Sequence, residues 1–288
     1  MQTLLADVAE LVRRALRLLP PSDGPDWVST SAAVWRAESL GGRLMAHPDV
    51  DRIRLDDLKC IDDQKAALVR NTRQFLAGAP ANNALLWGAR GTGKSSLIHA
   101  LLEAFFPDGL RLIEVDKLSL AKLPDIALSI REAPYRFIVF CDDLSFEADD
   151  PSYKALKSAL EGSIFRSSDN LLIYATSNRR HLLPEYMAEN EQARFQGGEL
   201  HQSEAVEEKI SLSDRFGLWL SFYPFRQDDY LSVAEYWVGE LAGRHGLTDP
   251  WSDEARAEAL RWALARGVRS GRTAQYFARH WIGSRIIG

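Results

Sequence analysis

Gly88-Ala89-Arg90-Gly91-Thr92-Gly93-Lys94-Ser95 is the stretch that decides the fold. It has the spacing G-x-x-x-x-G-K-[ST] of a phosphate-binding P-loop. Glycines let successive backbone N–H groups point at an anion, and a helix that begins at the loop adds its positive end. Lys94 would reach the outer phosphates of a nucleotide, and Ser95 would ligate magnesium. The alternative, a glycine-rich turn with a stray lysine, is disfavoured by the residues on either side.

These flanking residues alternate between strand and helix patterns. Asn83 to Trp87 is typical of a buried strand that enters the loop, and Lys94 to Phe106 has helical apolar spacing. A helix is also expected from Asp62 or Asp63 through Phe75, with further helices near 121–132 and 152–165. Short apolar runs predict five parallel strands covered on both faces, at 84–87, 110–115, 137–141, 171–175 and 218–222. The expected fold is therefore α/β, with a five-stranded parallel sheet flanked by helices.

The N-terminal part of the chain predicts a helical extension over residues 1–54. Residues 1–19 have amphipathic helical spacing but too much charge to span a bilayer, and docking on the protein itself is favoured over a membrane surface. The run Pro20 to Pro25 predicts a linker. Residues 26–54 are read as another helical piece that ends at Gly41-Gly42. We expect the P-loop domain to follow over residues 55–224.

The C-terminal part predicts a second, all-helical domain over residues 225–288. Its three helical patterns cover about 227–243, 251–266 and 272–282. Its expected core is Leu231, Trp237, Leu241, Leu260, Trp262, Phe277 and Trp281. Within the P-loop domain, residues 185–210 carry seven glutamates and predict an acidic insertion that is helical in part.

Composition sets the broad class. The chain has 288 residues, 46% of them hydrophobic, which is enough for one large core or two unequal ones. A net charge of -5 argues against a protein that coats nucleic acid or membrane by bulk charge. Cys60 and Cys141 lack metal-ligand spacing and are interpreted as structural thiols in a reducing compartment. Since no segment resembles a transmembrane or secretory sequence, a cytoplasmic location is expected.

A second acidic motif belongs with the P-loop. Residues 137–143 form an apolar strand that ends in Asp142 and Asp143, which is the Walker B arrangement. Asp142 would hold Mg²⁺, which prefers one or two carboxylates plus phosphate oxygens, and Asp143 would face the attacking water. The alternative is a pair of acids at a solvent-exposed strand end.

The order of these motifs resembles that of an AAA+ ATPase, from about residue 55 to the end of the chain. After the P-loop and Walker B come Thr176-Ser177-Asn178, then Ser213-Asp214-Arg215-Phe216, and then a helical tail. Three stretches resemble a bacterial family that carries only a domain-of-unknown-function label: Cys141–Glu147, Thr176–Leu182 and Glu207–Leu218. More distantly, the chain is similar to helicase-loader and transposition-helper ATPases. The resemblance implies an α/β ATPase domain followed by a helical lid.

This resemblance also implies roles for single residues. Asn178 matches sensor 1, a polar side chain beside the γ-phosphate and the attacking water. Arg215 matches the arginine finger that AAA+ proteins offer to a neighbouring subunit, so a homo-oligomer is expected. Arg272 matches sensor 2 in the lid, with Arg269 as its competitor, and Ile61 lies where the family packs adenine. The remaining expected nucleotide contacts are Gly88, Arg90, Gly91, Thr92, Gly93, Lys94, Ser95 and Ser96.

Asp143 departs from the family pattern. Many AAA+ enzymes have glutamate at this position, so the shorter side chain would slow hydrolysis unless Glu147 assists. The leading hypothesis is an ATPase that uses ATP and Mg²⁺ to move its lid or subunits against an unknown protein client. The alternatives are an ATP-dependent switch that barely hydrolyses, and a DNA-associated loader or transposition helper. Nucleic acid is not favoured, because the acidic insertion has the wrong sign for a phosphate backbone.

Overall fold

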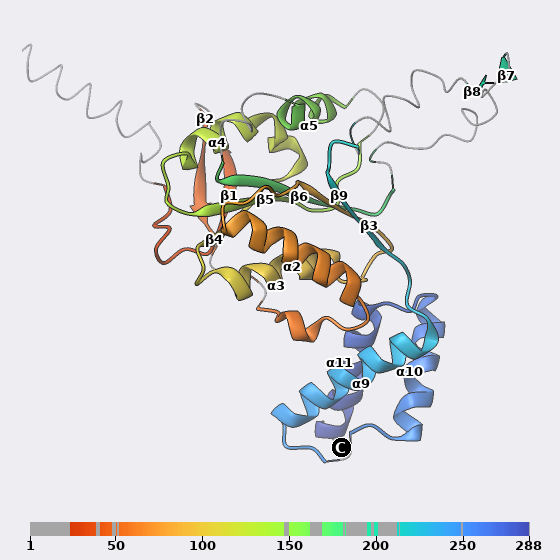
Figure 1. The fold of residues 1–288 in the computed structure, drawn as a ribbon. Coiled ribbons are helices and arrows are strands. Elements are labelled where there is room, and N and C mark those ends of the chain that lie inside the picture. Colours follow the sequence, from red (N-terminus) through yellow and green to blue (C-terminus); the bar gives the residue numbers. More distant parts are fainter. Residues whose placement is uncertain are drawn as a thin grey trace, which may run out of the picture.

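The fold combines one large sheet, helices on both of its faces and a bundle of three helices at the C-terminal end (Figure 1). The computed structural model describes residues 24–38, 41–47, 50, 52–146, 150–161, 169–180, 182, 195–196, 199–200, 212, 214–248 and 250–287. Within these residues, no helix is both long and apolar enough to cross a membrane.

The sheet has seven strands in the order β2-β1-β4-β5-β6-β3-β9. All neighbouring strands are parallel except β1 and β2. The five predicted strands are β3 (Ala84–Gly88), β4 (Leu110–Glu114), β5 (Arg136–Cys141), β6 (Leu171–Ser177) and β9 (Leu218–Phe222). The expected α/β fold is therefore confirmed, and the P-loop strand β3 lies between β6 and β9.

Helices cover both faces of the sheet, as the apolar strands require. Successive residues of β5 alternate between two cores, with Phe137 and Val139 in one and Ile138 and Phe140 in the other. Two helices bury their apolar sides in the second core, α2 (Asp62–Leu76) and α3 (Lys94–Phe105). The first core is covered by η2 (Lys117–Lys122), α4 (Leu123–Ile130) and α5 (Pro151–Glu161). The two layers are separated by the sheet in Figure 1.

The prediction of a helical piece within residues 26–54 is wrong over residues 32–46. This segment forms a hairpin of β1 (Ala32–Glu38) and β2 (Gly41–Ala46) at one edge of the sheet. Trp35 lies opposite Leu44 and both are buried, so they form a cross-strand pair on the core side of the hairpin. A Cβ on Gly42 would lie 2.4 Å from the Trp35 indole, so this glycine makes room for the ring instead of ending a helix.

The domain boundaries at 54 and 224 remain our proposal, with residues 32–46 belonging to the sheet. Residues 1–23 lie outside the described part, so the helix expected at 1–19 stays a prediction. Of the acidic insertion 185–210, the structure describes the short antiparallel pair β7 (Phe195–Gln196) and β8 (Glu199–Leu200), and the helix expected there also stays a prediction.

The lid consists of α9 (Gln227–Arg244), α10 (Asp253–Arg266) and α11 (Gly271–Ile287). Its core buries Leu231 and Phe277, and the tryptophans expected in the core pack partly buried around it. Ser252 caps α10 by accepting a hydrogen bond from the Ala255 N–H, and Gly267 ends the helix with φ 67°. The lid lies at the carboxyl ends of the parallel strands, next to the P-loop (Figure 1).

Candidate functional site

The P-loop connects β3 to α3 through a backbone path that requires glycine. Gly88 has φ 127°, and a Cβ there would lie 2.0 Å from the Phe222 carbonyl oxygen. The next residue, Ala89, donates its N–H to that same carbonyl at 2.9 Å, which ties the loop to β9. Gly91 and Gly93 also have positive φ, at 73° and 99°. The loop is thus fixed by two neighbouring strands before α3 begins.

Lys94 is buried within this loop. Its Nζ donates hydrogen bonds to the carbonyl oxygens of Gly88 at 2.9 Å and Ala89 at 2.8 Å, and contacts Asn178 Oδ1 at 3.4 Å. Loss of water around the ammonium lowers the pKa of Lys94, and the nearby carboxylates Asp143 and Asp142 oppose that effect. A desolvated cation at the start of a helix is a site for an anion such as a phosphate.

Asp142 lies at the centre of a group of hydroxyl contacts. Ser95 donates its hydroxyl to Asp142 Oδ1 at 2.7 Å, and Thr176 donates to the same oxygen. Thr176 also accepts a hydrogen bond from the Asp143 N–H at 2.9 Å. Thr176 was quoted as part of a motif but was given no role from the sequence. The parallel register of Cys141 with Ala175 places it beside Asp142.

The donor set around Asp142 fits magnesium. Ser95 and Asp142 supply oxygen ligands next to a phosphate-binding loop, which is how Mg²⁺ is usually held. In the described part of the chain, no group of three or more His, Cys, Asp and Glu could hold a metal ion. A magnesium ion here would therefore take its other ligands from the nucleotide and from water.

Asp143 and Asn178 are in direct contact. Asp143 has φ 49°, a left-handed conformation that is uncommon for residues other than glycine, although aspartate adopts it more often than most. Asn178 Nδ2 donates a hydrogen bond to Asp143 Oδ1, while its Oδ1 faces Lys94. The expected base, the expected sensor and the P-loop lysine thus form one chain of contacts.

A cavity of about 430 Å³ joins these residues to the lid. Its wall includes the expected residues Ile61 and Arg272, and the Arg272 N–H donates to the Gly91 carbonyl at 3.1 Å. The competing Arg269 does not line it. Leu58 and Lys59, which neighbour Ile61 in the segment expected to pack adenine, also line the cavity. Sequence reasoning missed the lining residues Ile53, Asp57, Phe225, Val233, Trp237, Gly271 and Gln275. They come from segments whose meeting depends on how the lid docks.

Two of the expected residues that the structure describes, Gly88 and Arg215, do not line the cavity. Arg215 is half-buried, and its role as an arginine finger stays a prediction. Glu147 lies outside the described residues, so its assisting role stays a prediction. Arg90 and Ser96, in contrast, line the cavity together with Gly91, Thr92, Gly93, Lys94 and Ser95.

Three solved structures share this fold. The chain is similar to a RuvB mutant from Thermotoga maritima, at 17% identity and a TM-score of 0.51, over 78% of this chain and 64% of that one. The Aeropyrum pernix ORC1 protein in complex with DNA is 16% identical, with a TM-score of 0.54, over 83% of this chain and 63% of that one. AMPPCP-bound DnaA from Aquifex aeolicus is 12% identical, with a TM-score of 0.50, over 80% of this chain and 63% of that one. The chain thus spans 63–64% of these proteins, and the shared fold is that of AAA+ P-loop ATPases.

No curated protein matches the chain. Residues 28–285 match a family described as "Protein of unknown function (DUF815)". The match covers the P-loop, Walker B, Asn178, Arg215 and the whole of the lid up to Arg285. Because it includes far more than half of the residues, the chain belongs to the DUF815 family.

Proposed function

We propose that the protein binds ATP with Mg²⁺ and hydrolyses it, and that the resulting lid or subunit movement acts on a protein client. The observation that carries this proposal is the meeting of Lys94, Asp142, Asn178 and Arg272 at one cavity between sheet and lid. A P-loop by itself would support phosphate binding only. The additional carboxylates, amide and lid arginine are the groups that phosphoryl transfer to water requires.

Each residue has a distinct role in this proposal. The P-loop N–H groups and Lys94 hold the phosphates, and Arg272 contacts them from the lid. Ser95 and Asp142 would hold Mg²⁺, which supplies positive charge against the phosphates when bound. Asp143 orients the attacking water, and Asn178, whose amide contacts Asp143, acts as sensor 1 beside the γ-phosphate and that water.

Replacement of the P-loop lysine tests the proposal directly. In Lys94→Ala the buried ammonium is lost, so ATP binding measured by titration calorimetry should fall below detection or by at least about a hundredfold. Lys122→Ala is the matched control, because Lys122 pairs with Asp125 on the surface away from the cavity. Equal ATP affinity in Lys94→Ala and Lys122→Ala would refute the proposed site.

The role of Arg215 in a neighbouring subunit has its own test. A finger arginine supplies about a thousandfold or more in turnover, so Arg215→Ala should hydrolyse ATP at least about a thousandfold more slowly. If the arginine acts across subunits, mixing Arg215→Ala with Lys94→Ala should restore part of the activity, because some interfaces then combine an intact P-loop with an intact arginine. Unchanged turnover in Arg215→Ala would contradict the assignment.

A slow ATP-dependent switch is the second candidate, and the contact between Asn178 and Asp143 favours it. A carboxylate engaged by an amide is less available to a water molecule, and aspartate is already shorter than glutamate. Single-turnover measurements separate the two functions. Release of phosphate within minutes supports an ATPase, whereas ATP that is intact after hours supports a switch.

A DNA-associated role is the third candidate. It is suggested by the solved ORC1 structure in complex with DNA, which shares the fold with this chain. A filter-binding titration across salt concentrations tests it, because phosphate contacts make affinity fall steeply as salt rises. Absence of salt-sensitive binding would leave the protein client as the proposed target.

A further inference from the structure

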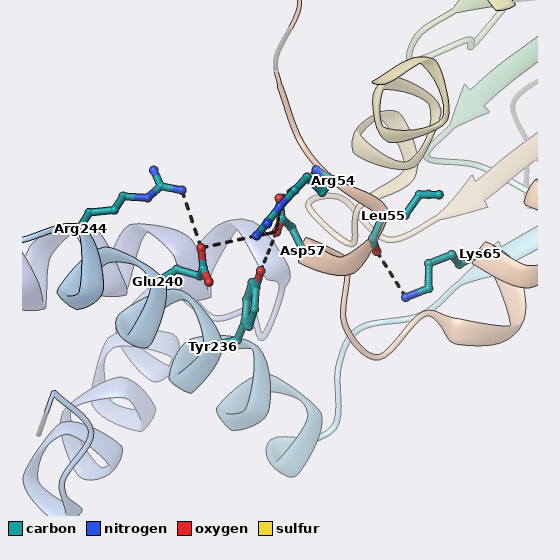
Figure 2. Close-up of polar contacts among 7 residues, drawn as sticks. All are labelled: Arg54, Leu55, Asp57, Lys65, Tyr236, Glu240 and Arg244. Atoms are coloured by element: carbon teal, nitrogen blue, oxygen red, sulfur yellow. Dashed lines mark hydrogen bonds and ion pairs between the residues drawn. The ribbon is translucent and has the colours of Figure 1, made fainter. Parts of the chain in front are cut away.

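Residues 52–61, here called the strap, form one wall of the cavity and also touch the lid. The strap includes η1 (Leu55–Asp57) and precedes α2. Its cavity-lining residues are Ile53, Asp57, Leu58, Lys59 and Ile61. Asp57 and Arg54 of the strap also contact α9, the first helix of the lid (Figure 2). The strap is therefore shared by the nucleotide cavity and the lid.

Asp57 is the centre of the contact between strap and lid. Its buried carboxylate accepts hydrogen bonds from the Arg54 backbone N–H at 2.8 Å and from the Arg54 guanidinium at 2.9 and 3.2 Å. It also accepts one from the Tyr236 hydroxyl at 2.6 Å, across the boundary between strap and lid. Figure 2 shows Tyr236 reaching up from α9 toward this carboxylate. Asp57 is thus held by its own segment and by the lid together.

Weaker contacts extend the same interface along α9. Arg54 Nη2 lies 3.6 Å from Glu240 Oε2, and the Lys59 ammonium lies 4.6 Å from the centre of the Tyr236 ring. At the beginning of α9, the Cys60 thiol faces the Asp229 carbonyl at 3.7 Å. The exposed Arg54–Glu240 pair contributes little, because water and salt screen it. The Asp57–Tyr236 hydrogen bond is part-buried and has a charged acceptor, so it is the strongest of these contacts.

The pKa values of the two partners agree with this ranking. Burial alone would raise the pKa of Asp57, but the hydrogen bonds from Tyr236 and Arg54 and the positive charge of Arg54 together lower it. Burial and the hydrogen bond to Asp57 raise the pKa of Tyr236 to about 12. Asp57 is therefore ionised and Tyr236 neutral near pH 7, which is the state that the hydrogen bond needs.

The face of α9 that carries Tyr236 also lines the cavity. Val233 and Trp237 form part of the cavity wall, and they lie three residues before and one residue after Tyr236. Val233 lies three residues before Tyr236 and four before Trp237, so it neighbours both on α9. Because all three belong to one helix, movement of α9 away from the strap would also withdraw Val233 and Trp237 from the cavity. Elsewhere in the cavity wall, the Arg272 N–H donates a hydrogen bond to the Gly91 carbonyl at 3.1 Å. The lid thus contacts both the strap and the P-loop.

We propose that Asp57 and Tyr236 form a latch that holds the lid on the strap, and that nucleotide binding and the closed latch stabilise each other. The coupling to nucleotide rests on the proposed function, whereas the latch between strap and lid does not. Coupling between two equilibria is reciprocal. If closing the lid raises the affinity for nucleotide by some factor, bound nucleotide must favour the closed lid by the same factor. Tyr236 is a positioning residue here, because it acts through the strap and α9 and does not itself line the cavity.

The chain contains its own reporter of lid opening. Cys60 is half-buried against the lid core, and burial is the main reason why its pKa is raised. The other cysteine, Cys141, is the fully buried last residue of β5, and burial raises its pKa to about 12. Opening of the lid would expose Cys60 and lower its pKa, and both changes accelerate alkylation. Cys141 should stay unreactive for as long as the sheet is folded.

The experiment measures the rate at which iodoacetamide alkylates Cys60 without nucleotide. Tyr236→Phe removes only the latch hydroxyl and should raise this rate about tenfold, the loss expected for a hydrogen bond to a charged group. Tyr276→Phe is the matched control, since it removes an exposed lid hydroxyl outside the cavity wall. Asp57→Asn provides a second variant and should accelerate alkylation in the same way. Unreactive Cys141 in each variant shows that the fold is intact.

ATP with Mg²⁺ tests the coupling. In the wild type, ATP with Mg²⁺ should slow Cys60 alkylation. By reciprocity, Tyr236→Phe should bind ATP more weakly, by a factor up to about the rise in alkylation rate that the same substitution causes. In Lys94→Ala, ATP should no longer change the alkylation rate. Equal alkylation rates in Tyr236→Phe, Tyr276→Phe and the wild type would overturn the latch, whether or not ATP binds. A fast Tyr236→Phe rate without any ATP binding would instead keep the latch and refute the proposed function.

Discussion

Thr176→Val is the substitution that best tests the geometry of the proposed magnesium site. Thr176 lies on β6 with 1% of its surface exposed, and valine has nearly the same shape. The change therefore leaves packing intact and removes one hydroxyl. That hydroxyl donates to Asp142 Oδ1 and accepts from the Asp143 N–H at 2.9 Å. Both residues of the Walker B pair thus lose a contact at once.

The magnitude follows from these two hydrogen bonds. A hydrogen bond to a charged group contributes about 1.5–3 kcal/mol, and a buried N–H that loses its partner costs about 1–3 kcal/mol. Asp142 and Asp143 are exposed, so water can replace part of what is lost and the lower ends of these ranges apply. We expect Thr176→Val to lower the free energy of unfolding by about 2–3 kcal/mol. Partners of a metal ligand typically change metal affinity about 10–100-fold, so the magnesium dependence of ATP binding should weaken on that scale.

Urea unfolding measures the first effect, and titration of ATP affinity against Mg²⁺ concentration measures the second. Thr176→Ser is the matched variant, because it keeps the hydroxyl and loses only a methyl group; its magnesium dependence should match the wild type. The reasoning is refuted if Thr176→Val unfolds within about 0.5 kcal/mol of the wild type and binds ATP with the same magnesium dependence.

Two further predictions concern backbone strain and the titration of the latch. Gly88→Ala should destabilise the protein by more than about 2 kcal/mol, because the new Cβ would lie 2.0 Å from the Phe222 carbonyl oxygen at a residue with positive φ. A Cβ at Gly239 would have no atom within 4 Å, so Gly239→Ala should stabilise α9 by about 0.5–1 kcal/mol. Urea unfolding of the two variants side by side checks both signs. Folding favours neutral Tyr236, whose pKa rises from 10.0 to about 12, so its contribution to stability is full below pH 10 and is lost as pH rises toward 12. The charged groups around it are Asp57, Arg54, Lys59 and Glu240. The stability difference between wild type and Tyr236→Phe should shrink over that pH range, and a constant difference would contradict the assignment.

The central sheet could be predicted from sequence because its strands are buried on both faces. Such strands are continuous apolar runs, and each of the five was separated from the next by a helical pattern or a loop. The hairpin at residues 32–46 could not be predicted in this way, since its apolar run, Ala32 to Trp35, is short and periodicity alone does not distinguish such a run from part of a helix. Its decisive feature is the packing of the Trp35 indole over Gly42, a contact between side chain and backbone that no periodicity reveals.

The candidate site divides along similar lines. The P-loop, Asp142 and Asn178 could be found because their chemistry is carried by short motifs at strand ends. The role of Thr176 was missed because it depends on the register between β5 and β6. Asp57 and Tyr236 were missed for a stronger reason: they are 179 residues apart and meet only when the lid docks on the strap. Tertiary contacts of this kind have no local signal.

The contacts of Lys94 suggest how one site could serve either as an ATPase or as a switch. An ammonium has three donors, and the carbonyls of Gly88 and Ala89 with Asn178 Oδ1 account for three acceptors. A phosphate bound by Lys94 must therefore replace one of them, and the Asn178 contact, at 3.4 Å, is the longest. Asn178 would then be free to turn, and its amide is the group that holds Asp143. Efficient hydrolysis requires that Asn178 release this carboxylate once phosphate is bound. A switch results if Asn178 keeps it, so the fate of a single amide decides between the two functions.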